Sequence, residues 1–148
     1  MQTMTTVPLA VFAPLLLAGL LAGCDELPAL LRRHTYPPNF KYISQAQLHS
    51  AMWQLADQVT DVDRVMHAPG MSEPERRAEV ERMLTDMLAT THALQVQGRP
   101  TNHPVIGEHL DGFERDLNQA LVGVKAEPPN YYLVGTVSGA CLSCHSPQ

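Results

Sequence analysis

Apolar residues recur at helical spacing over residues 44–67. They are Leu48, Met52, Leu55, Val59, Val62 and Met66, separated alternately by four and three positions. This spacing places the apolar side chains on one face of a helix, which predicts an amphipathic helix packed against a core. Ser44 is a suitable N-cap, and Pro69-Gly70 predicts where this helix stops.

Three further segments show the same periodicity, over residues 72–97, 101–127 and from 130 to the C-terminal cysteines. Ser72 and Glu75 form a capping-box pattern at the start of the second segment. The third segment has two N-cap candidates of suitable type, Thr101 and Asn102. The fourth begins near Asn130.

No segment alternates apolar and polar residues with period two, so no strand is expected. Short connections rich in Pro and Gly make consecutive helices antiparallel neighbours. The sequence therefore predicts an all-α fold, an up-down-up-down antiparallel four-helix bundle, and 148 residues suit one such domain. The formal net charge of −5 argues against a nucleic-acid partner, which requires a basic surface.

The N-terminal segment is set apart from this fold. Residues 7–22 are apolar and lead into Leu21-Ala22-Gly23-Cys24, which resembles a bacterial lipobox. The resemblance implies a lipoprotein signal peptide over residues 1–23, a lipid on Cys24 and a lipidated tether over residues 24–43. An uncleaved membrane anchor and a buried core helix are the alternatives.

The strongest chemical signal is Cys141-Leu142-Ser143-Cys144-His145, the C-x-x-C-H pattern of haem c attachment. Two thiols three positions apart on a helical turn can bond two vinyl groups along one side of a porphyrin. The next residue, His145, then directs its imidazole to the iron as an axial ligand. A zinc site would need four ligands, and a thioredoxin-like pair would lie at a helix N-terminus in a βαβ unit.

The position of the motif at the end of a helical chain resembles the class II c-type cytochromes, which include cytochrome c-prime and its methionine-ligated relatives. The resemblance implies a four-helix bundle over residues 44–148 with one covalent haem c on the last helix. The methionine-ligated relatives imply a sixth iron ligand from the first helix, whereas the high-spin relatives imply an empty or apolar distal side. Met52 matches the role of sixth ligand, and His49, one position off the apolar stripe, is its rival. The aromatic residues Trp53, Tyr131 and Tyr132 could pack on the haem edge or hydrogen-bond a propionate, and core packing is the default expectation.

These residues predict a periplasm-facing, membrane-tethered electron carrier rather than an enzyme, although a peroxidase-type activity stays open. Redox proteins are the expected partners, the lipid on Cys24 provides the membrane contact, and a homodimer is a further option. The alternative function is a high-spin haem protein that binds or senses NO or CO. An open distal site would distinguish it from an electron carrier with two axial ligands.

Overall fold

The computed structural model describes Leu31 and residues 35–145. The chain divides into two compact units, Met1–Phe40 and Lys41–Gln148. The predicted signal peptide and Cys24 lie outside the described residues. In the first unit, the rings of Tyr36 and Phe40 stack with their centroids 4.3 Å apart.

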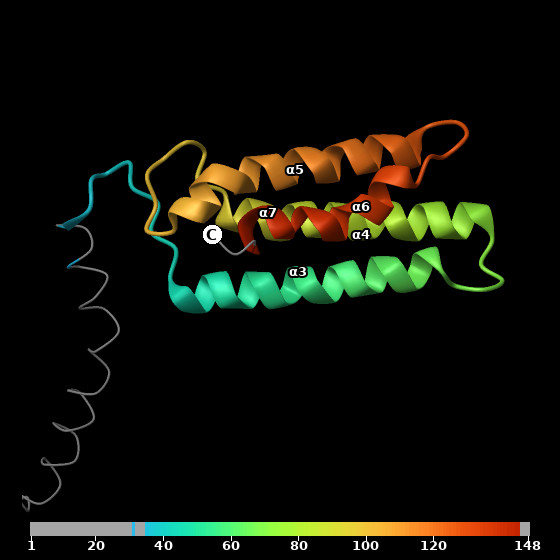
Figure 1. The fold of residues 1–148 in the computed structure, drawn as a ribbon, viewed down its shortest axis with the longest axis horizontal. Helices are drawn as coiled ribbons and strands as arrows, with labels where there is room; N and C mark the ends of the chain where they lie inside the picture. Colours follow the sequence, from blue (N-terminus) through green and yellow to red (C-terminus); the bar gives the residue numbers. More distant parts are fainter. Residues whose placement is uncertain (1–30, 32–34, 146–148) are drawn as a thin grey trace, which may run out of the picture. The chain divides into compact units, whose positions relative to one another are not determined.

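The second unit is an all-α bundle, which confirms the all-α part of the predicted fold class (Figure 1). Within the described residues it contains no strand, only an isolated bridge between Lys41 and Thr101. Its helices are α3 (Gln45–Met66), α4 (Glu73–Leu94), α5 (Pro104–Lys125), α6 (Tyr132–Ala140) and the single-turn α7 (Leu142–His145). No helix in the described part of the chain combines the length and the apolar content needed to cross a membrane.

The predicted N-cap Ser44 and the predicted Ser72–Glu75 capping box are both present, and Ser44 also forms a capping box with Gln47. The Gln47 N–H donates to the Ser44 hydroxyl (3.2 Å), and the Ser44 N–H donates to the Gln47 side chain (2.9 Å), so α3 begins at the predicted N-cap. The Ser72 N–H donates to the Glu75 carboxylate at the start of α4 (3.0 Å). The Ser72 hydroxyl and N–H lower the pKa of Glu75, because they hydrogen-bond to its charged form.

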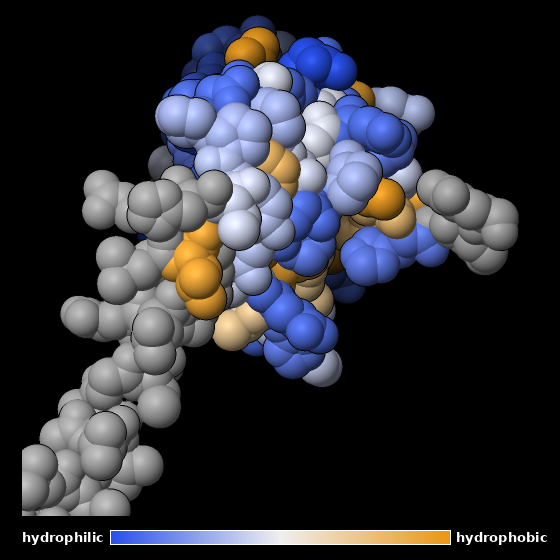
Figure 2. All heavy atoms as spheres, turned by 90° about the vertical axis from the view of Figure 1, so that its left-hand side faces the viewer, coloured by the Kyte–Doolittle hydropathy of each residue, from blue (hydrophilic) through white to orange (hydrophobic). Residues whose placement is uncertain are grey.

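The predicted apolar stripes form the core. All six stripe residues of α3 belong to or pack against two buried clusters, and the stripes of α4 and α5 supply most of the remaining members. The most extensive helix–helix contacts are α3–α4, α4–α5 and α5–α6, whereas α3 and α6 make few contacts. Seen from the end where α3 begins, the visible surface is predominantly hydrophilic (Figure 2).

Three predicted helix boundaries are wrong. The second helix ends at Leu94, because Gln95 adopts an extended conformation and Val96 turns into the core. The third begins at Pro104 with His103 at the N-cap position. The fourth begins at Tyr132 and is interrupted at Cys141, after the weakly helix-forming Gly139.

Asn102 does not cap the third helix because its side chain binds another segment. Its Oδ1 accepts from the Ile43 N–H (2.9 Å) and its Nδ2 donates to the Ile43 carbonyl (2.8 Å). The His103 Nε2 also lies 3.0 Å from that carbonyl. Ile43 is buried, with 2% of its surface exposed, so these bonds fix the segment that enters α3.

We expect Asn102→Ala to lower the free energy of unfolding by about 1–3 kcal/mol, because a partly buried N–H loses its acceptor. Urea unfolding followed by circular dichroism measures this change. Asn118→Ala is the matched control, since the Asn118 side chain makes one exposed bond within its own helix. Equal effects of the two substitutions would contradict a specific role for Asn102.

Candidate functional site

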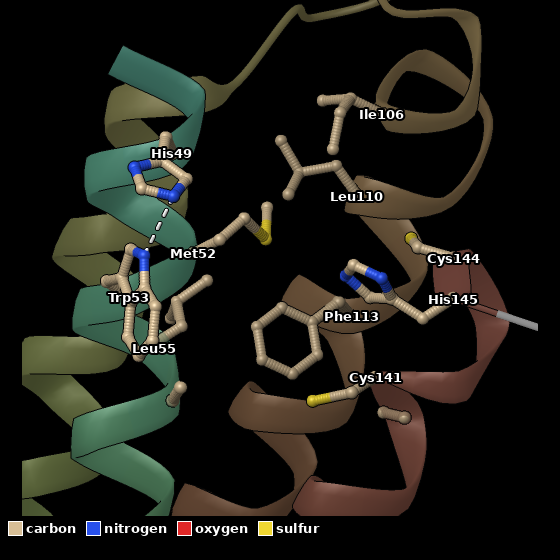
Figure 3. Close-up of a pocket in the computed structure, with 12 residues that line it drawn as sticks. His49, Met52, Trp53, Leu55, Ile106, Leu110, Phe113, Cys141, Cys144 and His145 are labelled. Carbon is tan, nitrogen blue, oxygen red and sulfur yellow. Dashed lines mark hydrogen bonds between the residues drawn. The ribbon is translucent and has the colours of Figure 1, made fainter. Parts of the chain in front are cut away.

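Helices α3, α5, α6 and α7 enclose a cavity of about 360 Å³ (Figure 3). This volume falls within the range of small-molecule sites, roughly 300–1,000 Å³. The lining residues are His49, Met52, Trp53, Leu55, Ala56, Ile106, Leu110, Phe113, Ala140, Cys141, Cys144 and His145. All the haem-site residues predicted from the sequence therefore lie around a single cavity.

The C-x-x-C-H segment forms one tight turn. The N–H groups of Cys144 and His145 both donate to the Cys141 carbonyl, at 3.3 and 3.1 Å. Figure 3 shows the His145 ring extending from α7 into the cavity, with the Cys141 sulfur near Phe113. The turn thus presents two thiols and one imidazole to the same space.

The two thiols differ in their surroundings. Cys141 is exposed, whereas Cys144 is partly buried. Burial, and secondarily the neighbouring Cys141, raise the pKa of the Cys144 thiol, because both disfavour its thiolate. Cys144 is therefore kept in the neutral thiol form over a wider pH range than an ordinary cysteine.

Met52 reaches the cavity from the opposite wall. It is partly buried and packs against both core clusters. Figure 3 shows its side chain directed from α3 into the cavity, while His145 enters from α7. A thioether and an imidazole that approach from opposite walls are the donor types of a methionine–histidine haem site.

The His49 side chain is hydrogen-bonded to Trp53 on the same helix. Its Nε2 accepts a hydrogen bond from the Trp53 indole N–H at 2.8 Å, and the two rings meet edge to face (Figure 3). Coordination of iron through Nε2 would require this bond to break, which favours Met52 over His49. His49 is exposed, as expected for a position off the apolar stripe.

The prediction that the aromatic residues pack in the core is wrong for two of them. Trp53 is 59% exposed and lies at the lip of the cavity, and Tyr132 is 76% exposed. Tyr131 is partly buried, and its hydroxyl donates to Glu73 (2.8 Å). The spacing of His49 and Trp53, one helical turn apart and off the stripe, was the available signal for their contact.

The apolar wall from α5 was not identified as part of the site. Ile106, Leu110 and Phe113 line the cavity, but their spacing along the helix is that of ordinary core residues. Periodicity gives the buried face of a helix and does not separate a packed wall from a cavity wall.

The chemistry of these residues fits a covalently held haem. Apolar walls suit the porphyrin, the two thiols on one turn suit thioether bonds, and the imidazole and thioether suit the two faces of the iron. No family model, curated protein or solved structure matches this chain. The functional interpretation therefore depends on the motif and on the residues that surround it.

Proposed function

We propose that this chain is a monohaem c-type cytochrome that transfers electrons, with haem c held covalently in the cavity between α3 and α7. The observation that carries the proposal is the placement of Cys141, Cys144, His145 and Met52 around one apolar cavity. When bound, the haem supplies one-electron redox chemistry at its iron.

Each residue has a distinct role in this proposal. Cys141 and Cys144 provide the thioether bonds that prevent dissociation. His145 binds the iron through an imidazole nitrogen, and Met52 provides a soft, neutral thioether that favours the ferrous state and raises the reduction potential. Leu110 and Phe113 would provide apolar walls for the porphyrin, which would also favour the less charged, reduced state.

The remaining features of the proposal concern the whole chain. The up-down-up-down antiparallel topology is supported by short connections between helices that pack on one another in chain order. A lipid on Cys24 would tether the protein to the periplasmic side of a bacterial membrane, where it would meet redox proteins. A homodimer remains an additional proposal.

Covalent attachment is the direct test. The full chain is produced with the cytochrome c maturation machinery, and the mature protein is analysed on a denaturing gel by haem staining and intact mass. We expect a haem-stained band with the mass of the polypeptide plus one haem. A colourless band at the bare polypeptide mass would overturn the proposal.

Trp53 provides a second test because it is the only tryptophan in the chain and lines the cavity. We expect its fluorescence to be almost fully quenched in the haem-bound protein, through energy transfer to the porphyrin. The emission should return in the Cys141→Ser/Cys144→Ser protein.

A relocated tryptophan is the control for this measurement. Val122 is 71% exposed and lies nine residues beyond Phe113 on α5, about 13 Å along the helix. In a Trp53→Phe/Val122→Trp protein, quenching should be measurably weaker. Equal quenching at both positions would contradict placement of the haem next to Trp53.

A further inference from the structure

The segment that carries the attachment motif contains no charged residue of the Asp, Glu, Lys or Arg type. None occurs in residues 128–145, which include α6 and α7. By contrast, residues 41–127 contain thirteen acidic and eight basic residues, a net charge of −5. The uncharged stretch therefore coincides with the part of the bundle at which the proposed haem is bonded.

The outer surface of this segment is open to solvent. Tyr132 is 76% exposed and Leu142 is 64% exposed. Thr136, Ser138 and Gly139 between them are also exposed. A solvent-facing surface ordinarily carries roughly a quarter or more charged residues, so an uncharged surface with an exposed tyrosine and leucine is unusual.

We propose that this uncharged α6–α7 face is the docking surface for a redox partner protein whose own contact face is uncharged. The inference rests on the proposed function, because it assigns the surface nearest the thioether bonds to electron exchange. The cores of protein interfaces are depleted of charged residues and enriched in aromatic ones. Small residues such as Ser138 and Gly139 allow the partner backbone to approach closely.

The lack of charged residues on α6 and α7 favours a partner protein whose contact face is also uncharged. Asp63 and His67 of α3 border this face beside Gly135 and Ser138. Away from that edge, a partner with a charged contact face would bury its charges without counter-charges from α6 or α7 and would lose their hydration free energy. A basic partner would instead be attracted to the acidic surfaces of α3, α4 and α5. A membrane fits less well, because interfacial helices usually carry Lys or Arg on their polar side.

The test uses the full-length haem protein in non-ionic detergent, with gold electrodes coated with alkanethiol monolayers as defined partner faces. We expect the fastest electron transfer at a hydroxyl-terminated monolayer. The electron-transfer rate at that monolayer should change less than about twofold when added salt shortens the Debye length from roughly 30 to 8 Å. A faster, salt-sensitive rate at an amine-terminated monolayer would overturn the inference, because it would show docking through an acidic face.

Charge insertion provides the matched variants. Ser138→Glu should slow transfer at the hydroxyl-terminated monolayer by about tenfold, equivalent to ~1.4 kcal/mol, whereas Gln119→Glu on the exposed side of α5 should not. Gly135→Glu is a second variant, since a Cβ there meets no atom within 4 Å. Equal effects of Ser138→Glu and Gln119→Glu would attribute the change to overall charge and overturn the assignment of this face.

A vesicle experiment separates the membrane from the partner protein. After reconstitution into phosphatidylcholine vesicles, the protein should react with aqueous tris(phenanthroline)cobalt at its rate in detergent. A large loss would show that the membrane covers the face and would overturn the inference. Haem staining comes first: absence of haem contradicts the proposed function, whereas haem without a preference for the uncharged monolayer contradicts only the docking face.

Discussion

A Cys141→Ser/Cys144→Ser protein is expected to lose all covalently bound haem. The two sulfurs lie on one turn beside a single cavity. A serine hydroxyl does not form the thioether bonds that hold the porphyrin. The denatured protein should therefore show no haem stain and only its polypeptide mass, a complete loss rather than a graded one.

The single variants refine this prediction. Cys141→Ser and Cys144→Ser each leave one thiol, so each should retain a reduced amount of haem joined by one bond. Leu142→Ala and Ser143→Ala are matched controls, because both residues are exposed within the same turn and carry no thiol. They should keep the wild-type haem content. Full haem staining of the double cysteine variant would show that attachment occurs elsewhere.

The apolar stripe of α3 shows what the sequence predicts well. Each of its six positions packs in or against the core, and Ser44 caps the helix as expected. Both features depend on residues within a few positions of one another, where helical periodicity and capping chemistry are decided. The C-x-x-C-H motif is equally local, so its place at the end of the last helix followed from the sequence alone.

The sequence predictions that the structure contradicts involve contacts between distant segments or competing local hydrogen bonds. Asn102 binds Ile43, 59 residues away. The local sequence does not indicate that the side chain of this N-cap candidate is hydrogen-bonded to another segment. Trp53 is exposed although tryptophan is usually well buried, and its indole N–H donates to His49 at the edge of the cavity. The cavity itself arises from the arrangement of α3, α5 and α7, which periodicity within one helix does not encode.

Met52→Ala is expected to remove the sixth iron ligand. The haem spectrum should change from low-spin and six-coordinate to high-spin, and CO should then bind, because the thioether that closes this face is gone. The reduction potential should fall by about 100 mV or more, part of the ~0.8 V range that axial ligands control. Visible absorption spectra with and without CO, together with a redox titration, measure these effects.

Two variants on α3 separate ligation from packing. Met66 belongs to the same stripe and packs against the core but does not line the cavity. Met66→Ala should therefore lower the free energy of unfolding, by up to a few kcal/mol, and leave the haem spectrum unchanged. His49→Ala should release Trp53 and also leave the spectrum unchanged, because the His49 Nε2 already accepts the indole N–H.

The pattern across these variants distinguishes the two functions considered for the chain. Identical spectra of the wild-type and Met52→Ala proteins would show that Met52 is not the ligand. A spectral change in His49→Ala alone would assign the role to His49. A wild-type protein that is already high-spin and binds CO would favour gas binding over electron transfer. Because Met52 reaches the cavity opposite His145 while His49 is held by Trp53, we expect the change to follow Met52.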